Sequence, residues 1–282
     1  MELDTSDPAA LLADRVAACL PENVRSGTGL LGIAYSGGVD SATLVAIAAR
    51  ALGPDRVVAL LGVSPSLAAT EREIARAVAG DLGVPVVEIE THEGDNPAYV
   101  ANGPDRCFHC KDELFTRIDA GVVDELGLAA VAYGENADDA RRPDRPGARA
   151  AANHRVLRPL AEAGLGKGEV RRVARWLGLA VADKPAAPCL ASRIPHHEPV
   201  TPEKLRQVEQ AEAGVRRLGV GDCRVRHHGD VARLEVPVDE IGVVVTRREE
   251  ILAVVRAAGF RFVALDLGGI QSGAFTLPLV TR

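Results

Sequence analysis

The sequence predicts an α/β protein with a mainly parallel sheet, followed by a smaller α+β domain. Segments typical of strands and helices alternate along the first part of the chain, polar turns follow the ends of the strands, and the texture changes after residue 196. Sheets of this kind bind ligands beyond the carboxyl ends of their strands. We therefore expect domains at residues 1–196 and 197–282, with ligand-binding turns in the first.

Apolar runs and helix-forming runs define the elements of the first domain. A helix is expected to begin the chain at residues 7–20. The charged, proline-containing residues 141–149 predict an exposed loop. Residues 183–199, with four prolines and little periodicity, predict a functional loop or a domain junction. The other expected elements are strands at 30–35, 56–63, 86–89 and 129–133, and helices at 42–52, 68–82, 111–126 and 165–176.

The second domain opens with a clear helix start. Thr201, Pro202 and Glu203 provide a cap, a proline and an acidic first turn, and the helix is expected to continue to residue 218. The elements that complete this domain are a hairpin at 224–228 and 231–236, a helix at 247–258 and a strand at 261–267.

Composition and charge argue against a nucleic-acid or membrane protein. A chain of 282 residues with 47% hydrophobic and 3% aromatic side chains can form two domains with aliphatic cores. Its net charge of −6 disfavours nucleic acid, whose affinity comes from neutralised phosphates. Residues 1–4 lack the features of a signal peptide, and no apolar run is long enough to span a membrane. We therefore expect a cytoplasmic protein.

Residues 36–41, of sequence SGGVDS, are the most informative motif because they separate a strand from a helix. Backbone N–H groups at such a turn converge on an anion, which predicts a phosphate site. The glycines allow close backbone approach and the serines add hydroxyl donors. Asp40 is expected to hold Mg²⁺ against the phosphates. The expected phosphate-binding residues are Ser36, Gly37, Gly38 and Ser41.

The motif differs from the Walker loop, in which a lysine beside Ser or Thr binds the β- and γ-phosphates, because no such lysine follows here. It resembles the PP-loop signature instead. That resemblance implies an enzyme that cleaves ATP between the α- and β-phosphates, holds the pyrophosphate and forms an adenylate. Ser64, Gly134 and Glu135 fall at neighbouring strand ends and are expected to bind the nucleotide too. A turn that merely joins strand to helix is the alternative.

Five cysteines in a reducing compartment are not expected to form disulfides. Cys19 and Cys223 lie in apolar surroundings and are expected to be small buried side chains. Cys189 lies in a proline-bounded loop beside Arg193, which makes it a candidate nucleophile or metal ligand, with an inert thiol as the alternative.

Six segments in order make the chain similar to the LarE family, and the similarity covers nearly the whole chain. They are SGGVDS (36–41), DRCFHCK (105–111), YGENADD (133–139), RPL (158–160), PCLASR (188–193) and RVR (224–226). The resemblance implies an ATP-dependent sulfur transferase for the nickel-pincer cofactor. A carboxylate of pyridinium-3,5-biscarboxylic acid mononucleotide would be adenylated, and a sulfur nucleophile would then displace AMP to leave a thiocarboxylate. It also implies a homo-oligomer, a hexamer.

The resemblance implies roles for individual residues. Asp40 would hold magnesium beside the pyrophosphate, and Cys189 would be the sulfur-bearing cysteine. Arg224 and Arg226, two apart on a strand, point to one face and could bind the substrate's phosphate and remaining carboxylate. A solvated strand face is the alternative for this pair. Further residues expected in the same pocket are Ser192, Arg193 and Glu212.

Cys107 and Cys110 determine how the sulfur is delivered. Together with Cys189 they provide three thiolates, which suit a four-iron four-sulfur (4Fe-4S) cluster with one iron open for a hydrosulfide. The rival interpretations are a structural zinc with His109 or His92 as a further ligand, and an unligated pair. In single-cysteine members of the family the cysteine gives up its own sulfur, so a sacrificial Cys189 is a further alternative.

Three other functions compete with this interpretation. A PP-loop tRNA thiolase uses the same adenylation, but no basic or aromatic RNA-binding module is evident. An amidotransferase-linked synthetase, such as a GMP or NAD synthetase, does not explain the three cysteines. A nucleotide-binding regulator without activity is the third, and mononucleotide-dependent pyrophosphate release distinguishes it from an enzyme.

Overall fold

The computed structural model describes residues 6–27, 29–142 and 146–271. These residues form two compact units. The first unit comprises Met1–Ser64, Ala69–His92 and Cys107–Ala187, and the second comprises Pro65–Ala68, Glu93–Arg106 and Pro188–Arg282. The domain boundary expected after residue 196 stays a prediction, and the acidic residues 1–4 lie outside the described part of the chain.

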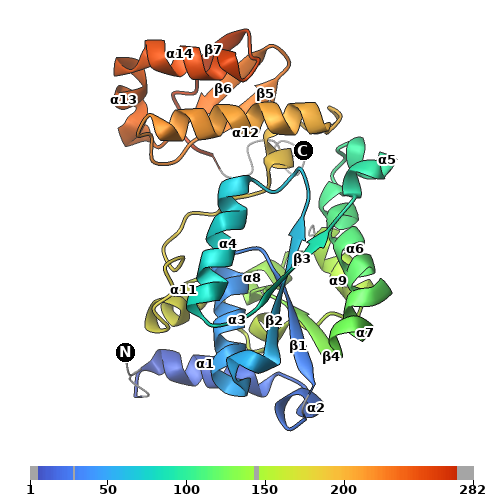
Figure 1. Ribbon diagram of the computed structural model, residues 1–282. Coiled ribbons are helices and arrows are strands. Elements are labelled where there is room, and N and C mark those ends of the chain that lie inside the picture. The colour runs from blue at the N-terminus through green and yellow to red at the C-terminus, as the bar shows by residue number, and fades with distance from the viewer. Residues whose placement is uncertain (1–5, 28, 143–145, 272–282) are drawn as a thin grey trace. The chain divides into compact units, whose positions relative to one another are not determined.

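The first unit is built on a parallel sheet, as expected (Figure 1). Within the described residues its strand order is β3-β2-β1-β4, and β1 pairs with both β2 and β4. The strands are β1 (Leu30–Tyr35), β2 (Val57–Val63), β3 (Val86–Glu90) and β4 (Leu128–Tyr133). The predicted α/β class with a parallel sheet is therefore confirmed, and the carboxyl ends of all four strands lie at one edge.

Helices cover both faces of this sheet (Figure 1). On one face α1 (Pro8–Ala18), α3 (Val39–Leu52) and α11 (Lys167–Trp176) pack on one another. On the other, Phe115 and Ile118 of the α6 region and Ala150 and Ala151 of α9 form a buried cluster with strand residues such as Leu60. The other helices of the first unit are α2 (Glu22–Arg25), α4 (Ala69–Asp81), α6 (Arg106–Arg117), α7 (Val123–Leu126), α8 (Ala137–Ala140), α9 (Pro146–Asn153) and α10 (Pro159–Glu162).

Two sequence-based expectations are wrong in this unit. The helix expected from residue 111 begins at Arg106, so Cys107 and Cys110 lie in its first turns and not in a preceding loop. It is also interrupted by a π-helical turn (Ile118–Val122) that contains the poor helix former Gly121. The expected loop at 141–149 is helical from Pro146 onward, because alanines of α9 are completely buried against the sheet. Residues 143–145 lie outside the described part of the chain.

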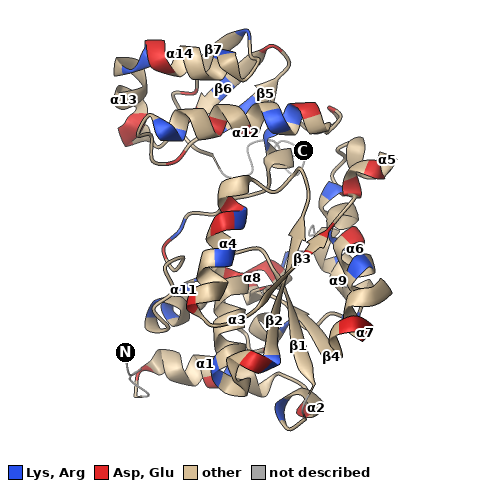
Figure 2. Ribbon diagram, viewed as in Figure 1, with Lys and Arg blue, Asp and Glu red and all other residues tan. Residues whose placement is uncertain are grey.

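The second unit contains a smaller sheet with strand order β5-β6-β7 among its described residues. Strands β5 and β6 form the expected hairpin, and β7 pairs parallel to β6. Thr201 caps α12 by accepting a hydrogen bond from the Lys204 N–H at 3.4 Å. Figure 2 shows acidic and basic positions interspersed along α12. The elements are α5 (Pro97–Val100), α12 (Pro202–Arg217), β5 (Arg224–His228), β6 (Val231–Glu235), α13 (Ile241–Thr246), α14 (Arg248–Ala257) and β7 (Phe262–Leu265).

None of the helices in the described ranges combines the length and apolar character that a membrane-spanning helix requires.

Candidate functional site

The turn between β1 and α3 is a closed loop that forms a candidate site within the first unit. Its two serine hydroxyls lie 3.3 Å apart, and the Ser36 N–H donates to Ser41 Oγ at 3.2 Å. Ser41 in turn donates to the Gly38 carbonyl at 3.1 Å. Gly37 has φ +69°, and a Cβ there would lie 2.7 Å from the Ala75 Cβ. The loop is therefore fixed in shape, with the N-terminus of the 14-residue helix α3 at its end.

The end of β4 approaches this loop very closely. A Cβ on Gly134 would lie 2.7 Å from the Ser41 nitrogen and 2.8 Å from the Asp40 carbonyl carbon, so only glycine fits there. The adjacent Glu135 is buried and pairs with Arg158 at 3.3 Å. Ser64 directly follows β2, the strand beside β1, and so lies at the same sheet edge. The structure thus gathers the sequence-predicted nucleotide residues at one edge of the sheet.

Asp40 is held by residues that sequence reasoning missed. Its Oδ2 lies 2.5 Å from Lys167 Nζ, and its Oδ1 accepts a hydrogen bond from Asn136 Nδ2 at 3.3 Å. Asn136 also caps α8 and donates to Asp139 at 2.9 Å. Carboxylate oxygens of this kind are the ligands that Mg²⁺ prefers. No local sequence signal joins Lys167 to Asp40, because they are 127 positions apart.

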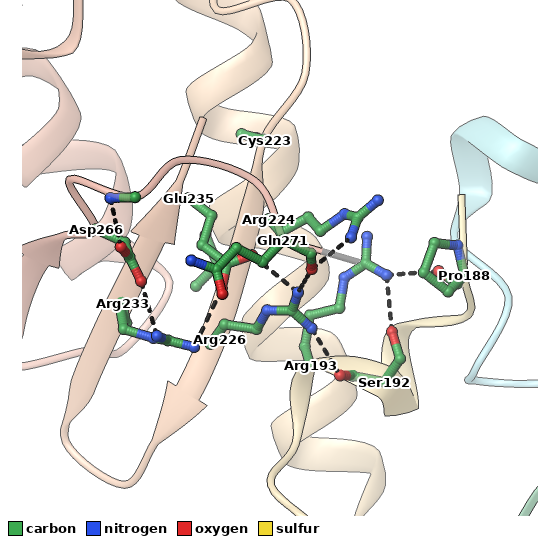
Figure 3. Close-up of polar contacts among 12 residues, drawn as sticks. Pro188, Ser192, Arg193, Cys223, Arg224, Arg226, Arg233, Glu235, Asp266 and Gln271 are labelled. Atoms are coloured by element: carbon green, nitrogen blue, oxygen red, sulfur yellow. Dashed lines mark hydrogen bonds and ion pairs between the residues drawn. The ribbon is translucent and has the colours of Figure 1, made fainter. Parts of the chain in front are cut away.

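Arg224 and Arg226 form a second candidate site, which lies within the second unit (Figure 3). They lie on the same face of β5 and are only 4% and 3% exposed, which excludes a solvated strand face. Arg226 donates to Glu235 at 2.8 Å and to the Ser192 carbonyl at 3.0 Å. Burial lowers the pKa of Arg224, and the nearby cations Arg193 and Arg226 lower it further. Three guanidinium groups in one buried cluster favour an anionic ligand.

Arg193 and Glu212 are bonded to each other. Arg193 Nε donates to Glu212 Oε1 at 2.9 Å and its Nη2 to Oε2 at 3.3 Å. The remaining nitrogen of Arg193 donates to Ser192 Oγ at 3.0 Å and to the Pro188 carbonyl at 2.5 Å. This pair therefore fixes the short turn that follows Cys189.

Cys223 is buried, as expected, whereas Cys19 is half-buried. Cys107 and Cys189 are exposed and Cys110 is half-buried. Burial raises the pKa of the Cys223 thiol to about 12 and also raises that of Cys19. All five lie in the described part of the chain, and none forms a disulfide. The described residues contain no group of three or more His, Cys, Asp or Glu side chains placed to hold a metal ion.

Comparison with known proteins gives matches over both units. A family described as NAD synthase matches residues 14–102. The chain is 33% identical to the pyridinium-3,5-bisthiocarboxylic acid mononucleotide synthase of Lactiplantibacillus plantarum, over 86% of this chain and 87% of that protein. It is 42% identical to an uncharacterized protein of Synechocystis, over 89% and 95% of the two chains. It is also 27% identical to an uncharacterized protein of Methanocaldococcus jannaschii, over 83% and 88%.

Proposed function

The chain belongs to the LarE family, and from this premise we propose that it is an ATP-dependent sulfur transferase acting on pyridinium-3,5-biscarboxylic acid mononucleotide. The observation that carries the proposal is the closed SGGVDS loop, with the N-terminus of α3 at its end and Asp40 in its first turn. In the first step a substrate carboxylate oxygen bonds to the α-phosphorus of ATP, and the bond to pyrophosphate breaks. In the second, a sulfur nucleophile bonds to the activated carbonyl carbon and AMP leaves.

The residues of the first unit serve the adenylation step. The backbone at the start of α3 and the hydroxyls of Ser36 and Ser41 bind the leaving pyrophosphate. Asp40 holds Mg²⁺ through its carboxylate. Gly134 keeps the end of β4 close to the loop, and Ser64 and Glu135 contact the nucleotide. The rigid backbone supports this assignment, since it needs little rearrangement as charge develops on the phosphates.

The residues of the second unit bind the mononucleotide. Arg224 and Arg226 take its phosphate and the carboxylate that is not reacting, which their burial and mutual proximity support. The backbone carbonyl of Ser192 accepts a hydrogen bond from Arg226, so Ser192 lies next to this arginine pair. Arg193 and Glu212 hold the turn that carries Cys189 and so position the sulfur donor. Residues 197–282 are proposed to form the substrate-binding and oligomerisation domain of a cytoplasmic hexamer.

Sulfur is delivered through Cys107, Cys110 and Cys189, which we assign to a 4Fe-4S cluster. Cys107 and Cys189 are exposed and Cys110 is half-buried, so these three cysteines are candidate cluster ligands, whereas the buried Cys223 is unsuited to that role. When bound, the cluster offers one iron position for an exchangeable sulfur ligand, supplied by sulfide or another donor. A sacrificial Cys189 is the competing route.

Two measurements test the proposal. The protein, incubated anaerobically with MgATP, sulfide and the mononucleotide, should convert a carboxylate into a thiocarboxylate, detected by mass spectrometry of the product. Transfer of sulfur to tRNA instead would favour a tRNA thiolase. Anaerobically reconstituted protein should absorb broadly at about 400 nm, and alanine at any of the three cysteines should abolish this absorption. A Cys189 lighter by about 34 Da after one transfer would identify the sacrificial route.

A further inference from the structure

Lys167 is anchored at the phosphate loop by both its backbone and its side chain. It is the first residue of α11, and its N–H donates to Asp138 Oδ2 at 2.7 Å. A capping bond from the Gly166 N–H to Glu169 at 3.0 Å fixes the same helix start. Its ammonium reaches Asp40 at 2.5 Å, and the side chain remains 39% exposed. The charge of Lys167 is therefore both close to the loop and accessible to a ligand.

The loop itself provides no cation for the phosphates of ATP. Asp40 adds negative charge, and Asp138 and Asp139 lie nearby in the same cluster of contacts. A phosphate site with this charge balance needs a positive group, which a Walker loop obtains from its own lysine. A lysine side chain is long, flexible and carries three donors, so it can change partners within a few ångströms.

We propose that Lys167 is the phosphate-binding lysine of this site. It holds Asp40 in the nucleotide-free protein, and it transfers to the β-phosphate side of ATP when Mg²⁺ binds the Asp40 carboxylate. The inference rests on the proposed function only in assigning ATP to the loop. The exchange keeps each charge paired, because Asp40 gains the metal as it loses the lysine.

The test compares Lys167→Gln with Lys184→Gln by calorimetric titration of MgATP, pyrophosphate and AMP. Lys184 is a matched control, since it forms a similar pair with Glu71 at 2.6 Å and has no assigned role. Lys167→Gln should weaken ATP and pyrophosphate binding roughly 10- to 100-fold, as expected for a charge-assisted contact, and leave AMP binding unchanged. Lys167→Arg should recover part of this loss.

Two outcomes would overturn the inference: unchanged ATP affinity in Lys167→Gln, or an equal loss for AMP. Because the experiment measures nucleotide binding, its result does not depend on whether the mononucleotide is the second substrate. Should the wild-type protein bind ATP through Lys167 yet release no pyrophosphate with the mononucleotide, the proposed function fails and this inference stands.

A second feature, in the other unit, is a short segment that occupies the arginine pair. We call residues 266–271 the strap. The Gln271 carbonyl accepts hydrogen bonds from Arg226 at 3.0 Å and from Arg224 at 3.3 Å (Figure 3). The strap is held by the Ile270 N–H, which donates to the Val236 carbonyl at 3.1 Å. Its first residue, Asp266, pairs with Arg233 at 2.8 Å.

The neutral Gln271 carbonyl does not balance the positive charges of Arg224 and Arg226, to which it is hydrogen-bonded. Two buried guanidinium groups share this one oxygen. Their bonds to it are charge-assisted only through the donor, whereas an anionic oxygen would add an ion-pair attraction and balance the positive charge. The same position would suit an oxygen of a phosphate or carboxylate. The strap and an anionic ligand therefore compete for the same donors.

We infer that the strap is an autoinhibitory contact: the Gln271 carbonyl must leave before an anionic oxygen can bind Arg224 and Arg226 together. The ligand's apparent affinity is then reduced by the free energy needed to move the strap. The arginines keep a partner in both states, which prevents them from being buried without one.

Gly269→Ala tests the strap without altering the arginines. Gly269 has φ +71°, and a Cβ there would lie 2.8 Å from Val238 Cγ2 and 3.1 Å from the Val236 carbonyl oxygen, so alanine should displace the strap. Gly229→Ala is the control, because its φ is +60° and no described heavy atom lies within 4 Å of its Cβ position. With inorganic phosphate as the probe, Gly269→Ala should bind several-fold more tightly, and Gly229→Ala should bind like the wild type.

Unchanged or weaker phosphate binding in Gly269→Ala would overturn the inference, the latter because the strap would then be part of the site. Asp266→Asn is a second variant, in case the alanine prevents folding. It weakens the pair with Arg233 and should shift phosphate affinity in the same direction.

Discussion

Arg193 and Glu212 form a two-point ion pair in which the side chains are only 5% and 2% exposed. Glu212 also accepts from the Val225 N–H at 3.0 Å and from Arg216 at 2.9 Å. The pair therefore joins the turn after Cys189 to α12 and β5. A buried charge that loses its partner is strongly destabilising, so this contact sets the geometry of the cysteine turn.

Glu212→Gln should destabilise the protein by about 3–5 kcal/mol, because Arg193 would be left buried without a carboxylate. Chemical denaturation measures this loss. Glu203→Gln, at an exposed position of the same helix, is the control and should change stability much less. An equal loss of stability in the two variants would show that the buried ion pair stabilises the protein no more than an exposed carboxylate does.

Asp40→Ala should abolish pyrophosphate release while the fold stays intact, because it removes the proposed magnesium ligand but no core packing. Circular dichroism checks the fold, and a coupled phosphate assay checks the activity. Release at the wild-type rate would contradict the assignment of the loop.

Gly134→Ala should abolish ATP binding, because its Cβ would lie within 2.8 Å of backbone atoms of both Asp40 and Ser41. Gly80→Ala is the matched control in the same unit: no described heavy atom lies within 4 Å of its Cβ position, and alanine favours its helix by about 0.5–1 kcal/mol. Normal ATP affinity in Gly134→Ala would mean that the loop tolerates displacement and is not the binding surface.

Arg224→Ala should raise the mononucleotide concentration needed for activity and leave the KM for ATP unchanged. Loss of a charge-assisted contact costs about 1.5–3 kcal/mol, or roughly one to two decades in affinity. Arg224 is preferred over Arg226 here, because Arg226 is also paired with the fully buried Glu235. An equal rise in both KM values would place Arg224 outside the mononucleotide site.

The stability of the first unit should depend on His154. Burial opposes its charge, but hydrogen bonds to Asp119 at 2.6 Å and Asp112 at 3.2 Å outweigh burial and raise its pKa. A histidine whose pKa is higher in the folded than in the unfolded protein stabilises the fold when it is protonated. This stabilisation is complete at pH values below the unfolded-state pKa of about 6.5, and it is lost as the pH rises through the folded-state pKa. His154→Gln should therefore lower the free energy of unfolding more at pH 5.5 than at pH 8.5. A larger loss at pH 8.5 than at pH 5.5 would show that the protonated form of His154 does not stabilise the fold.

The sequence predicted the parts of the site that depend on local pattern. The strand, the SGGVDS turn and the start of α3 follow one another directly, so Ser36 and Asp40 could be placed from spacing alone. Lys167 could not, because its contact with Asp40 closes across 127 positions. The Gln271 carbonyl was missed for a related reason: backbone oxygens carry no residue-type signal.

Helix boundaries failed where tertiary packing decided them. The alanines of α9 look like part of a charged loop in sequence, yet their small side chains let the helix pack closely on the sheet. The helix-forming run in the sequence predicts a helix only from Lys111, but the Arg106 N–H donates to the Gly103 carbonyl at 3.1 Å and the helix begins at Arg106, so that it includes Cys107 and Cys110.

The proposed adenylation is tested by measuring pyrophosphate release with MgATP, with and without pyridinium-3,5-biscarboxylic acid mononucleotide. Adenylation of a substrate carboxylate predicts release only when both are present, at a rate that saturates with the mononucleotide. Release that is absent, or that is equally fast without the mononucleotide, would show that the protein does not adenylate this substrate.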